Sequence, residues 1–268
     1  RRRRRHRHHL RQGLILPRLR VTTWNINSVR LRQDLVLKLL AETRPDVLCL
    51  QEIKVMTDLF PHDPYEQAGY KHRAVLGMKG YNGVAILSKT PLERVDGPDW
   101  CKKGDSRHLT ARIGGVEIHN FYVPSGGDIP DPKQNPKFAH KLAFVDEMAD
   151  WFRKNRKPKD PMILVGDLNI APLEHDVWSH KQLLDVVSHT PVEVEKLGHV
   201  QKSSEWVDAV RHFVPAERKL YRAASAWRRA EANGRRLCGF CHREARAGKW
   251  DCQNCHDGLE RARIEHGI

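Results

Sequence analysis

Residues 162–172 read MILVGDLNIAP, an apolar run that ends in the polar residues Asp167 and Asn169. Large apolar side chains followed by a glycine and an acid predict a buried strand over 162–166, with the polar groups at its tip. Because connecting segments that follow buried strands carry much of the chemistry of α/β proteins, this tip is the first candidate for a functional site.

Two earlier stretches show the same pattern, a predicted strand that ends in polar residues. TTWNINS places Asn25 and Asn27 at the end of an alternating strand over 20–26, and CLQEIK places Glu52 at the end of a mostly apolar strand over 46–52. A single polar residue at a strand tip is more often a cap or turn residue than a functional one. Three such tips favour a shared site, and carboxylates with carboxamides form the all-oxygen environment that Mg²⁺ prefers.

The rest of the pattern alternates strands with returning helices. We expect a helix over 31–43, a short strand over 83–87, a hairpin of 109–113 with 116–122, and a long helix over 136–152. Together these elements predict an α/β fold, a two-layered β-sandwich flanked by helices, whose active rim is made by the strand ends.

The basic character of the chain comes from its two ends. The formal net charge is +14, yet residues 1–20 hold 9 arginines and no acid, and residues 219–268 hold 11 basic against 6 acidic residues, so the middle is balanced. A basic patch suggests a polyanionic partner, and here nucleic-acid binding must rest on local arrangement. Residues 1–19 are predicted to be a disordered tail, either a nucleic-acid-binding arm or a solvated segment.

The location predicted from the sequence is a reducing cytoplasm, of bacterial type and near the nucleoid. No apolar run approaches the roughly 20 residues that cross a bilayer, so a membrane protein is not expected. Four of the six cysteines crowd the C-terminal part, unlike a secreted disulfide framework, and no signal peptide is evident.

At this point the sequence resembles the exonuclease III and abasic-site endonuclease family of the endonuclease/exonuclease/phosphatase superfamily. The resemblance is carried by WNINSVR at 24–30, LQEIK at 50–54, GYNGVAILSK at 80–89, NFYVPSGG at 120–127 and GDLNIAP at 166–172. It implies a nuclease domain over 20–220 that incises double-stranded DNA beside abasic sites and trims blocked 3′ ends as a 3′–5′ exodeoxyribonuclease. It also implies a monomer with Mg²⁺, or Mn²⁺, as cofactor.

The resemblance also implies roles for matching positions. Glu52 matches the magnesium carboxylate, and Asn25 its neighbour that orients the metal and a water. Asp167 matches the residue that handles a proton of the attacking water or leaving group, with Asn169 beside it at the metal and the scissile phosphate. Tyr122 matches the tyrosine that faces this phosphate, although a strand-end aromatic outside such a family is more often a packing residue.

Three further residues are candidate phosphate or DNA contacts. Arg30 and Lys54 follow the first two motifs, where a phosphate contact and ordinary solvated surface are both open. Ser125 stands in YVPSGG where some relatives have a side-chain amide, and its hydroxyl has a shorter reach.

Residues 221–268 depart from the family pattern. A tryptophan-rich loop, an Arg-Leu-Asp motif and a final Ser-Asp-His motif are expected there, but RRL at 235–237 is followed by Cys238, and Glu265–His266 is the nearest imitation of the final pair. We therefore expect a fold that is incomplete at this end and an impaired activity. The alternatives are a catalytically inactive DNA-binding remnant and a sister activity such as an RNA nuclease or a phosphatase.

The same segment contains two Cys-x-x-Cys pairs, formed by Cys238, Cys241, Cys252 and Cys255. Four thiolates at this spacing can surround Zn²⁺ tetrahedrally. Because His follows each pair, the motif also matches c-type haem attachment. A tail without a selected function, such as one from a disrupted reading frame, is the third interpretation.

Overall fold

The structure is a computed structural model, and it describes residues 18–218. Within this range the chain forms two compact units, residues 18–123 with 159–168, and residues 124–158 with 169–218. Residues 1–17 of the predicted N-terminal tail and the divergent segment with Cys238, Cys241, Cys252 and Cys255 lie outside the described residues, so the expectations for them stay predictions. Leu19, which the prediction assigns to the tail, packs against the core between the sheets.

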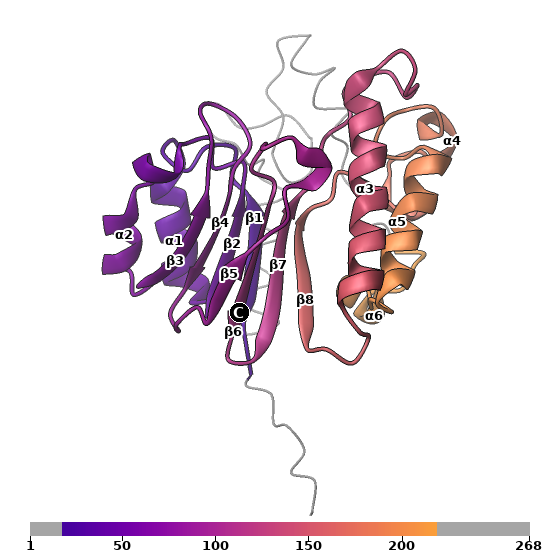
Figure 1. Cartoon of the computed structure of the whole chain (residues 1–268). Helices are drawn as coiled ribbons and strands as arrows, with labels where there is room; N and C mark the ends of the chain where they lie inside the picture. The colour runs from indigo at the N-terminus through magenta and orange to yellow at the C-terminus, as the bar shows by residue number, and fades with distance from the viewer. Residues whose placement is uncertain (1–17, 219–268) are drawn as a thin grey trace, which may run out of the picture. The chain divides into compact units, whose positions relative to one another are not determined.

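The first unit contains two four-stranded sheets (Figure 1). The first sheet has the order β1-β2-β4-β3 and consists of β1 (Val21–Asn25), β2 (Val47–Gln51), β4 (Val84–Ser88) and β3 (His72–Leu76). The second has the order β5-β6-β7-β8 and consists of β5 (Arg94–Asp96), β6 (His108–Ile113), β7 (Val116–Tyr122) and β8 (Met162–Asp167). The pairs β1–β2 and β7–β8 are parallel, and the other pairs are antiparallel.

Apolar side chains from both sheets form a common core between them. Val47 and Cys49 of β2 belong to this core, together with Ile86 of β4 and Ile118 of β7, all fully buried. Burial raises the pKa of the Cys49 thiol, so this cysteine remains a protonated core residue. The sandwich of two sheets that the sequence predicts is confirmed.

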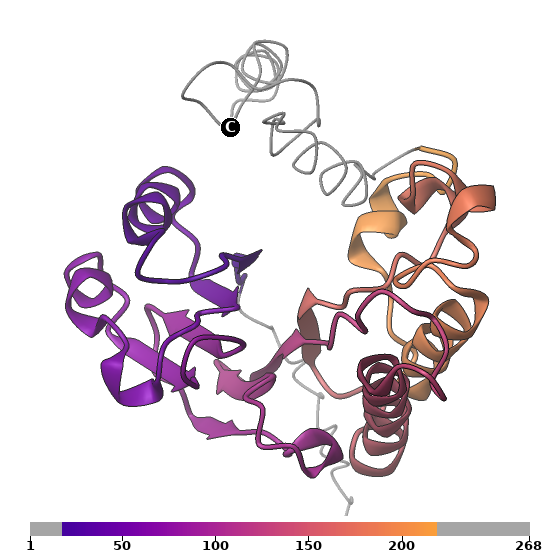
Figure 2. The ribbon, with the colours of Figure 1, turned by 90° about the horizontal axis from the view of Figure 1, so that it is seen from above.

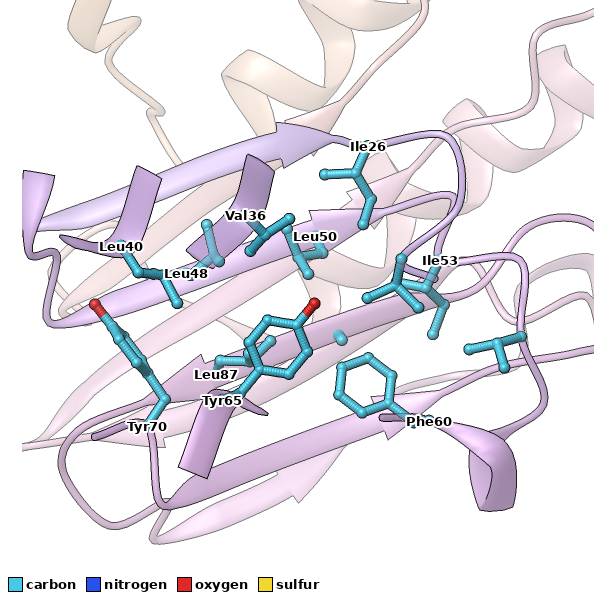
Figure 3. Close-up of a cluster of buried hydrophobic side chains, with 13 residues drawn as sticks. Ile26, Val36, Leu40, Leu48, Leu50, Ile53, Phe60, Tyr65, Tyr70 and Leu87 are labelled. Atoms are coloured by element: carbon cyan, nitrogen blue, oxygen red, sulfur yellow. The ribbon is translucent and has the colours of Figure 1, made fainter. Parts of the chain in front are cut away.

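The alternate residues of β2 point to the other face, where helices cover the first sheet. Leu48 and Leu50 pack there against Val36 and Leu40 of α1 (Gln33–Thr43) and Tyr65 of α2 (His62–Gln67), as Figure 3 shows. Successive side chains of a strand point to opposite faces, so a strand buried on both sides must be apolar throughout. This explains why the run before Glu52 has little polar alternation.

Two buried polar side chains connect the sheets close to the strand tips. Asn120 of β7 donates from Nδ2 to the carbonyl oxygens of Leu50 and Ala85, at 3.0 Å each, and accepts from Gln51 Nε2 at 2.6 Å. Polar groups in a dry core must be paired, so these bonds favour a single relative position of the two sheets.

The second unit is built around two helices, α3 (Pro136–Asn155) and α5 (Pro191–Ser203), which pack against each other (Figure 2). Both begin with a capping side chain followed by proline: Asn135 accepts from the Lys137 amide, and Thr190 accepts from the Glu193 amide in a capping box. Two shorter helices, α4 (His180–Leu183) and α6 (Ala209–Phe213), complete this unit, and short 3₁₀ turns lie at 57–59, 100–102 and 174–176.

Most predicted elements lie where the sequence places them, within a few residues. Strands β3 and β5 and helices α2, α4, α5 and α6 were not predicted, although Thr190, Pro191 and Glu193 form a recognisable helix-start signal for α5. Strand β3 begins with the polar residues His72 and Arg73, which weaken the apolar pattern. Among residues 18–218, no helix is at once long and apolar enough to span a membrane.

Candidate active site

The two parallel strand pairs place the predicted site residues at their carboxyl ends. Asn25, the last residue of β1, lies opposite Gln51, so Glu52 follows beside it. Tyr122, the last residue of β7, lies opposite Asp167, the last residue of β8. The carboxyl ends of parallel neighbours emerge on the same side of a sheet, which is why polar residues at these ends can form one site.

One side-chain amide joins the two carboxylates. Asn25 Nδ2 donates to Glu52 Oε1 and to Asp167 Oδ2, at 2.8 Å each, while Asn25 Oδ1 accepts from the backbone amide of Asn27 at 3.2 Å. An amide nitrogen has two hydrogens, so each carboxylate receives one of them. Asn25 therefore fixes both acids and brings together the tips of strands from both sheets.

A lysine neutralises one of these carboxylates. Lys54 Nζ lies 2.9 Å from Glu52 Oε2 and also donates to Asn27 Oδ1. The backbone of this segment is unusual, since Asn27, Glu52 and Lys54 all have left-handed conformations, with φ of 48°, 51° and 51°. Non-glycine residues adopt this conformation at a cost, and strained residues of this kind cluster at functional sites.

Glu52 is held in its charged form. Its partial burial alone would raise the pKa, but hydrogen bonds from Asn25, Lys54 and Tyr122 and the charge of Lys54 outweigh that effect and lower the pKa below its ordinary value. A carboxylate that stays ionised at neutral pH can accept hydrogen bonds and bind a cation.

Tyr122 is held in its neutral form. Burial, the negative charge of Glu52 and the hydrogen bond to Glu52 raise the pKa of Tyr122 well above its usual range, against the opposing charge of Arg107. The Arg107 guanidinium lies 4.8 Å from the centre of the Tyr122 ring and donates to the Tyr122 carbonyl oxygen at 3.3 Å. Tyr122 thus presents a hydroxyl donor in a fixed position.

The other three predicted residues lie on other segments. Arg30 is exposed after the β1 exit. Ser125 and Asn169 belong to the second unit, where their backbone carbonyl oxygens both accept from Lys141 Nζ, at 3.2 Å and 2.7 Å. Asn25, Glu52, Lys54, Tyr122 and Asp167 are brought together, while the functional roles of all eight stay predictions.

The donor set of the first unit fits a hard divalent cation. Glu52 and Asp167 supply carboxylate oxygens, and Asn25 supplies an amide that orients them. In residues 18–218 there is no group of three or more His, Cys, Asp or Glu side chains arranged to hold a metal. A pair of carboxylates with amides suits Mg²⁺, which keeps several waters and takes one or two protein carboxylates.

Sequence reasoning missed Arg107, which contacts Tyr122 in the first unit, and Lys141, which contacts Ser125 and Asn169 in the second. Arg107 could have been found from the hairpin, because Ile113 pairs with Val116 and counting outward places residue 107 opposite Tyr122. The Tyr122 amide indeed donates to the Arg107 carbonyl oxygen at 2.8 Å. No pattern in the sequence indicates that Lys141 is buried, since a lysine in a helix is usually exposed.

Comparisons with known proteins show the family of this chain. Residues 22–238 match the profile of the Endonuclease/Exonuclease/phosphatase family, whose members generally depend on a divalent metal. Exodeoxyribonuclease III of Haemophilus influenzae is 30% identical over 165 residues, which cover 59% of this chain and 60% of the relative. The match thus spans less than two thirds of that relative's length.

Solved structures give longer matches. An AP endonuclease from Archaeoglobus fulgidus has a TM-score of 0.69 and 33% identity, covering 79% of this chain and 82% of that one. A 3′ phosphatase from Neisseria, solved with a product DNA hairpin, has a TM-score of 0.64 and 31% identity, covering 69% and 71%. The chain belongs to the Endonuclease/Exonuclease/phosphatase family and, within it, to the exonuclease III type.

Proposed function

We propose that the chain is a metal-dependent nuclease that hydrolyses phosphodiester bonds of double-stranded DNA, beside abasic sites and at blocked 3′ ends. The observation that carries this proposal is the Asn25 amide, which holds Glu52 and Asp167 at 2.8 Å each. Two carboxylates fixed in this way can bind a cation and accept a hydrogen bond from a water molecule at the same time. An AP endonuclease and a DNA-bound 3′ phosphatase among the similar structures support DNA as the substrate class.

The proposed metal is Mg²⁺, with Mn²⁺ as its substitute. Glu52 would be its carboxylate ligand, Asn25 would orient that ligand, and Asp167 and Asn169 would complete the surroundings of the metal. When bound, the metal would supply charge stabilisation for the phosphoryl oxygens. The zinc site predicted from the C-terminal cysteines has no support from the described residues.

Asp167 and Tyr122 are the proposed proton-handling and hydrogen-bonding groups. An Asp167 carboxylate oxygen would accept a proton from the attacking water, and the hydrogen bond from Asn25 keeps this carboxylate in one orientation. Tyr122 keeps its proton, so its hydroxyl can donate to a phosphate oxygen. Fixed groups of this kind assist hydrolysis because they are already oriented when charge develops on the phosphate.

Arg30, Lys54, Ser125 and Asn169 are the proposed contacts to the DNA phosphates. Contacts of basic and hydroxyl groups with phosphates supply affinity and position without reading base sequence. Lys54 already pairs with Glu52, so its ammonium group would partly balance the charge of that carboxylate. The monomeric state, the cytoplasmic location and the predicted impairment of activity stay predictions.

The test is magnesium-dependent cleavage of a labelled duplex that carries one abasic site, using the full chain. Asp167→Asn removes a carboxylate charge while preserving shape, and Asp150→Asn, on the exposed side of α3, is the matched control. We expect cleavage by the parent chain and by Asp150→Asn, and its loss in Asp167→Asn and in EDTA. Salt-sensitive DNA binding by folded protein that never cleaves would favour the inactive DNA-binding remnant instead.

A further inference from the structure

Lys141 of α3 is a fully buried charge that the proposed chemistry does not use. Its ammonium group lies 2.5 Å from Glu193 Oε1, and the side chains of both residues are 0% exposed. Burying an ion pair costs more desolvation energy than its attraction commonly returns, and apolar residues of similar size are often as stable. The pair therefore calls for a reason other than stability.

The other contacts of Lys141 suggest that reason. Its Nζ donates to the carbonyl oxygen of Asn169 at 2.7 Å and to that of Ser125 at 3.2 Å, with Ser188 Oγ at 3.4 Å. An ammonium group has three hydrogens, and here it lies among one carboxylate, two loop carbonyls and the more distant Ser188 hydroxyl. Those loops carry the two proposed phosphate contacts of the second unit.

Glu193 connects Lys141 to a third segment, residues 188–190. Its carboxylate accepts from the Ser188 amide at 2.9 and 3.0 Å, from the Thr190 amide at 3.1 Å and from Thr190 Oγ1 at 2.7 Å. The carboxylate is thus surrounded by donors, and Lys141 supplies the balancing charge.

Segment 188–190 in turn holds the loop that follows Asn169. The Ala171 amide donates to the Ser188 carbonyl oxygen at 2.8 Å, and His189 Nδ1 lies 2.7 Å from the Ala171 carbonyl oxygen. Asn169 itself has a left-handed backbone, with φ of 52°. A conformation of this kind persists only when its surroundings enforce it.

We propose that Lys141 is a positioning residue: its ammonium group, locked by Glu193, holds the loops of Ser125 and Asn169 in one fixed relative arrangement. This inference rests on the proposed function, because it gives those loops a phosphate to bind. Because Glu193 neutralises Lys141, the effect is one of geometry and not of added positive charge.

The test compares the double variant Lys141→Met/Glu193→Gln with Lys196→Met. Removing both charges avoids an unpaired buried carboxylate, and the glutamine keeps one oxygen for the backbone amides. Lys196 pairs with Asp146, at 2.5 and 2.6 Å, and so also joins α5 to α3, but it holds no loop carbonyl. Thermal unfolding and circular dichroism first show which variants are folded.

We expect the double variant to lower kcat on the abasic duplex about 100-fold, as expected for misplaced binding groups, with a change in KM of less than about 3-fold. Hydrogen exchange should become faster in residues 166–172 and 186–190 and stay unchanged in the β6–β7 hairpin. Lys141→Arg, which keeps the charge and donors, should recover part of kcat, and Lys196→Met should match the parent.

The outcomes separate the two proposals. A parent chain that does not cleave overturns the proposed function, and the positioning role with it. A parent that cleaves, with a folded double variant that equals it in kcat and in loop exchange, overturns the positioning role alone. A loss of kcat shared by Lys196→Met would also overturn it, because the effect would then follow any break between α3 and α5.

Discussion

Asn25 and Asp167 are joined by a 2.8 Å hydrogen bond although 142 residues separate them in the sequence. One residue ends a strand of the first sheet and the other ends a strand of the second. The same Asn25 nitrogen also donates to Glu52. The tips of the two sheets are therefore connected by the amide group on which the proposed chemistry depends.

Replacing Asn25 tests this connection. In Asn25→Ala, two carboxylates lose their common donor, so we expect the magnesium concentration for half-maximal cleavage to rise about 10- to 100-fold. A magnesium titration of cleavage measures this. Asn155→Ala, which removes an amide that donates to the Trp151 carbonyl oxygen at 2.8 Å, is the matched control and should behave like the parent. An unchanged titration in Asn25→Ala would contradict the role of this amide.

Tyr122 offers a test of hydrogen bonding separate from packing. Tyr122→Phe keeps the ring beneath Arg107 and removes the hydroxyl, so kcat should fall about 100-fold while the free energy of unfolding changes by about 1 kcal/mol. Tyr70→Phe removes another buried hydroxyl, bonded to the Pro45 carbonyl oxygen at 2.6 Å, and should lose similar stability without losing kcat. Equal activities in the two variants would remove Tyr122 from the catalytic group.

Gly166 is required for the pairing of β7 with β8. Its φ is 140°, and a Cβ atom there would lie 1.9 Å from the Phe121 carbonyl oxygen. We expect Gly166→Ala to lower the free energy of unfolding by about 3 kcal/mol or more in urea titrations. Gly198→Ala in α5 has open space around it and should instead raise that energy by about 1 kcal/mol. A stable Gly166→Ala would mean that the strands can shift apart at no cost.

Glu52 predicts how stability responds to acid in metal-free buffer. Its folded-state pKa is lowered below the ordinary value of 4.5, so its contribution is fully present above pH 4.5 and is lost as pH falls through the folded pKa. The parent chain should therefore be more stable than Glu52→Gln at about pH 7, with the difference closing towards about pH 3. Urea unfolding in EDTA measures both proteins. A difference that widened in acid would mean that the pKa is raised.

The sequence was sufficient for the elements that end at the site. Strand β1 alternates, strands β2 and β8 are short apolar runs, and all three end in polar residues, a local pattern that needs no knowledge of the partner strand. Strands β3 and β5 were not predicted because they contain polar residues that weaken the apolar pattern. Their conformation is determined by pairing with β4 and β6. Tertiary pairing overrides a weak local preference.

The sequence by itself determined which polar residues stand at the strand tips, since hydrophobic burial dictates where each strand must end. Only the tertiary structure decided that Lys54 pairs with Glu52, that Arg107 lies over Tyr122 and that Lys141 is buried beside Glu193. Whether each of these charged side chains is exposed or paired depends on the distances between segments that are far apart in the chain. The burial of apolar side chains follows from residue type, whereas the burial and the partner of a charged side chain follow from the fold.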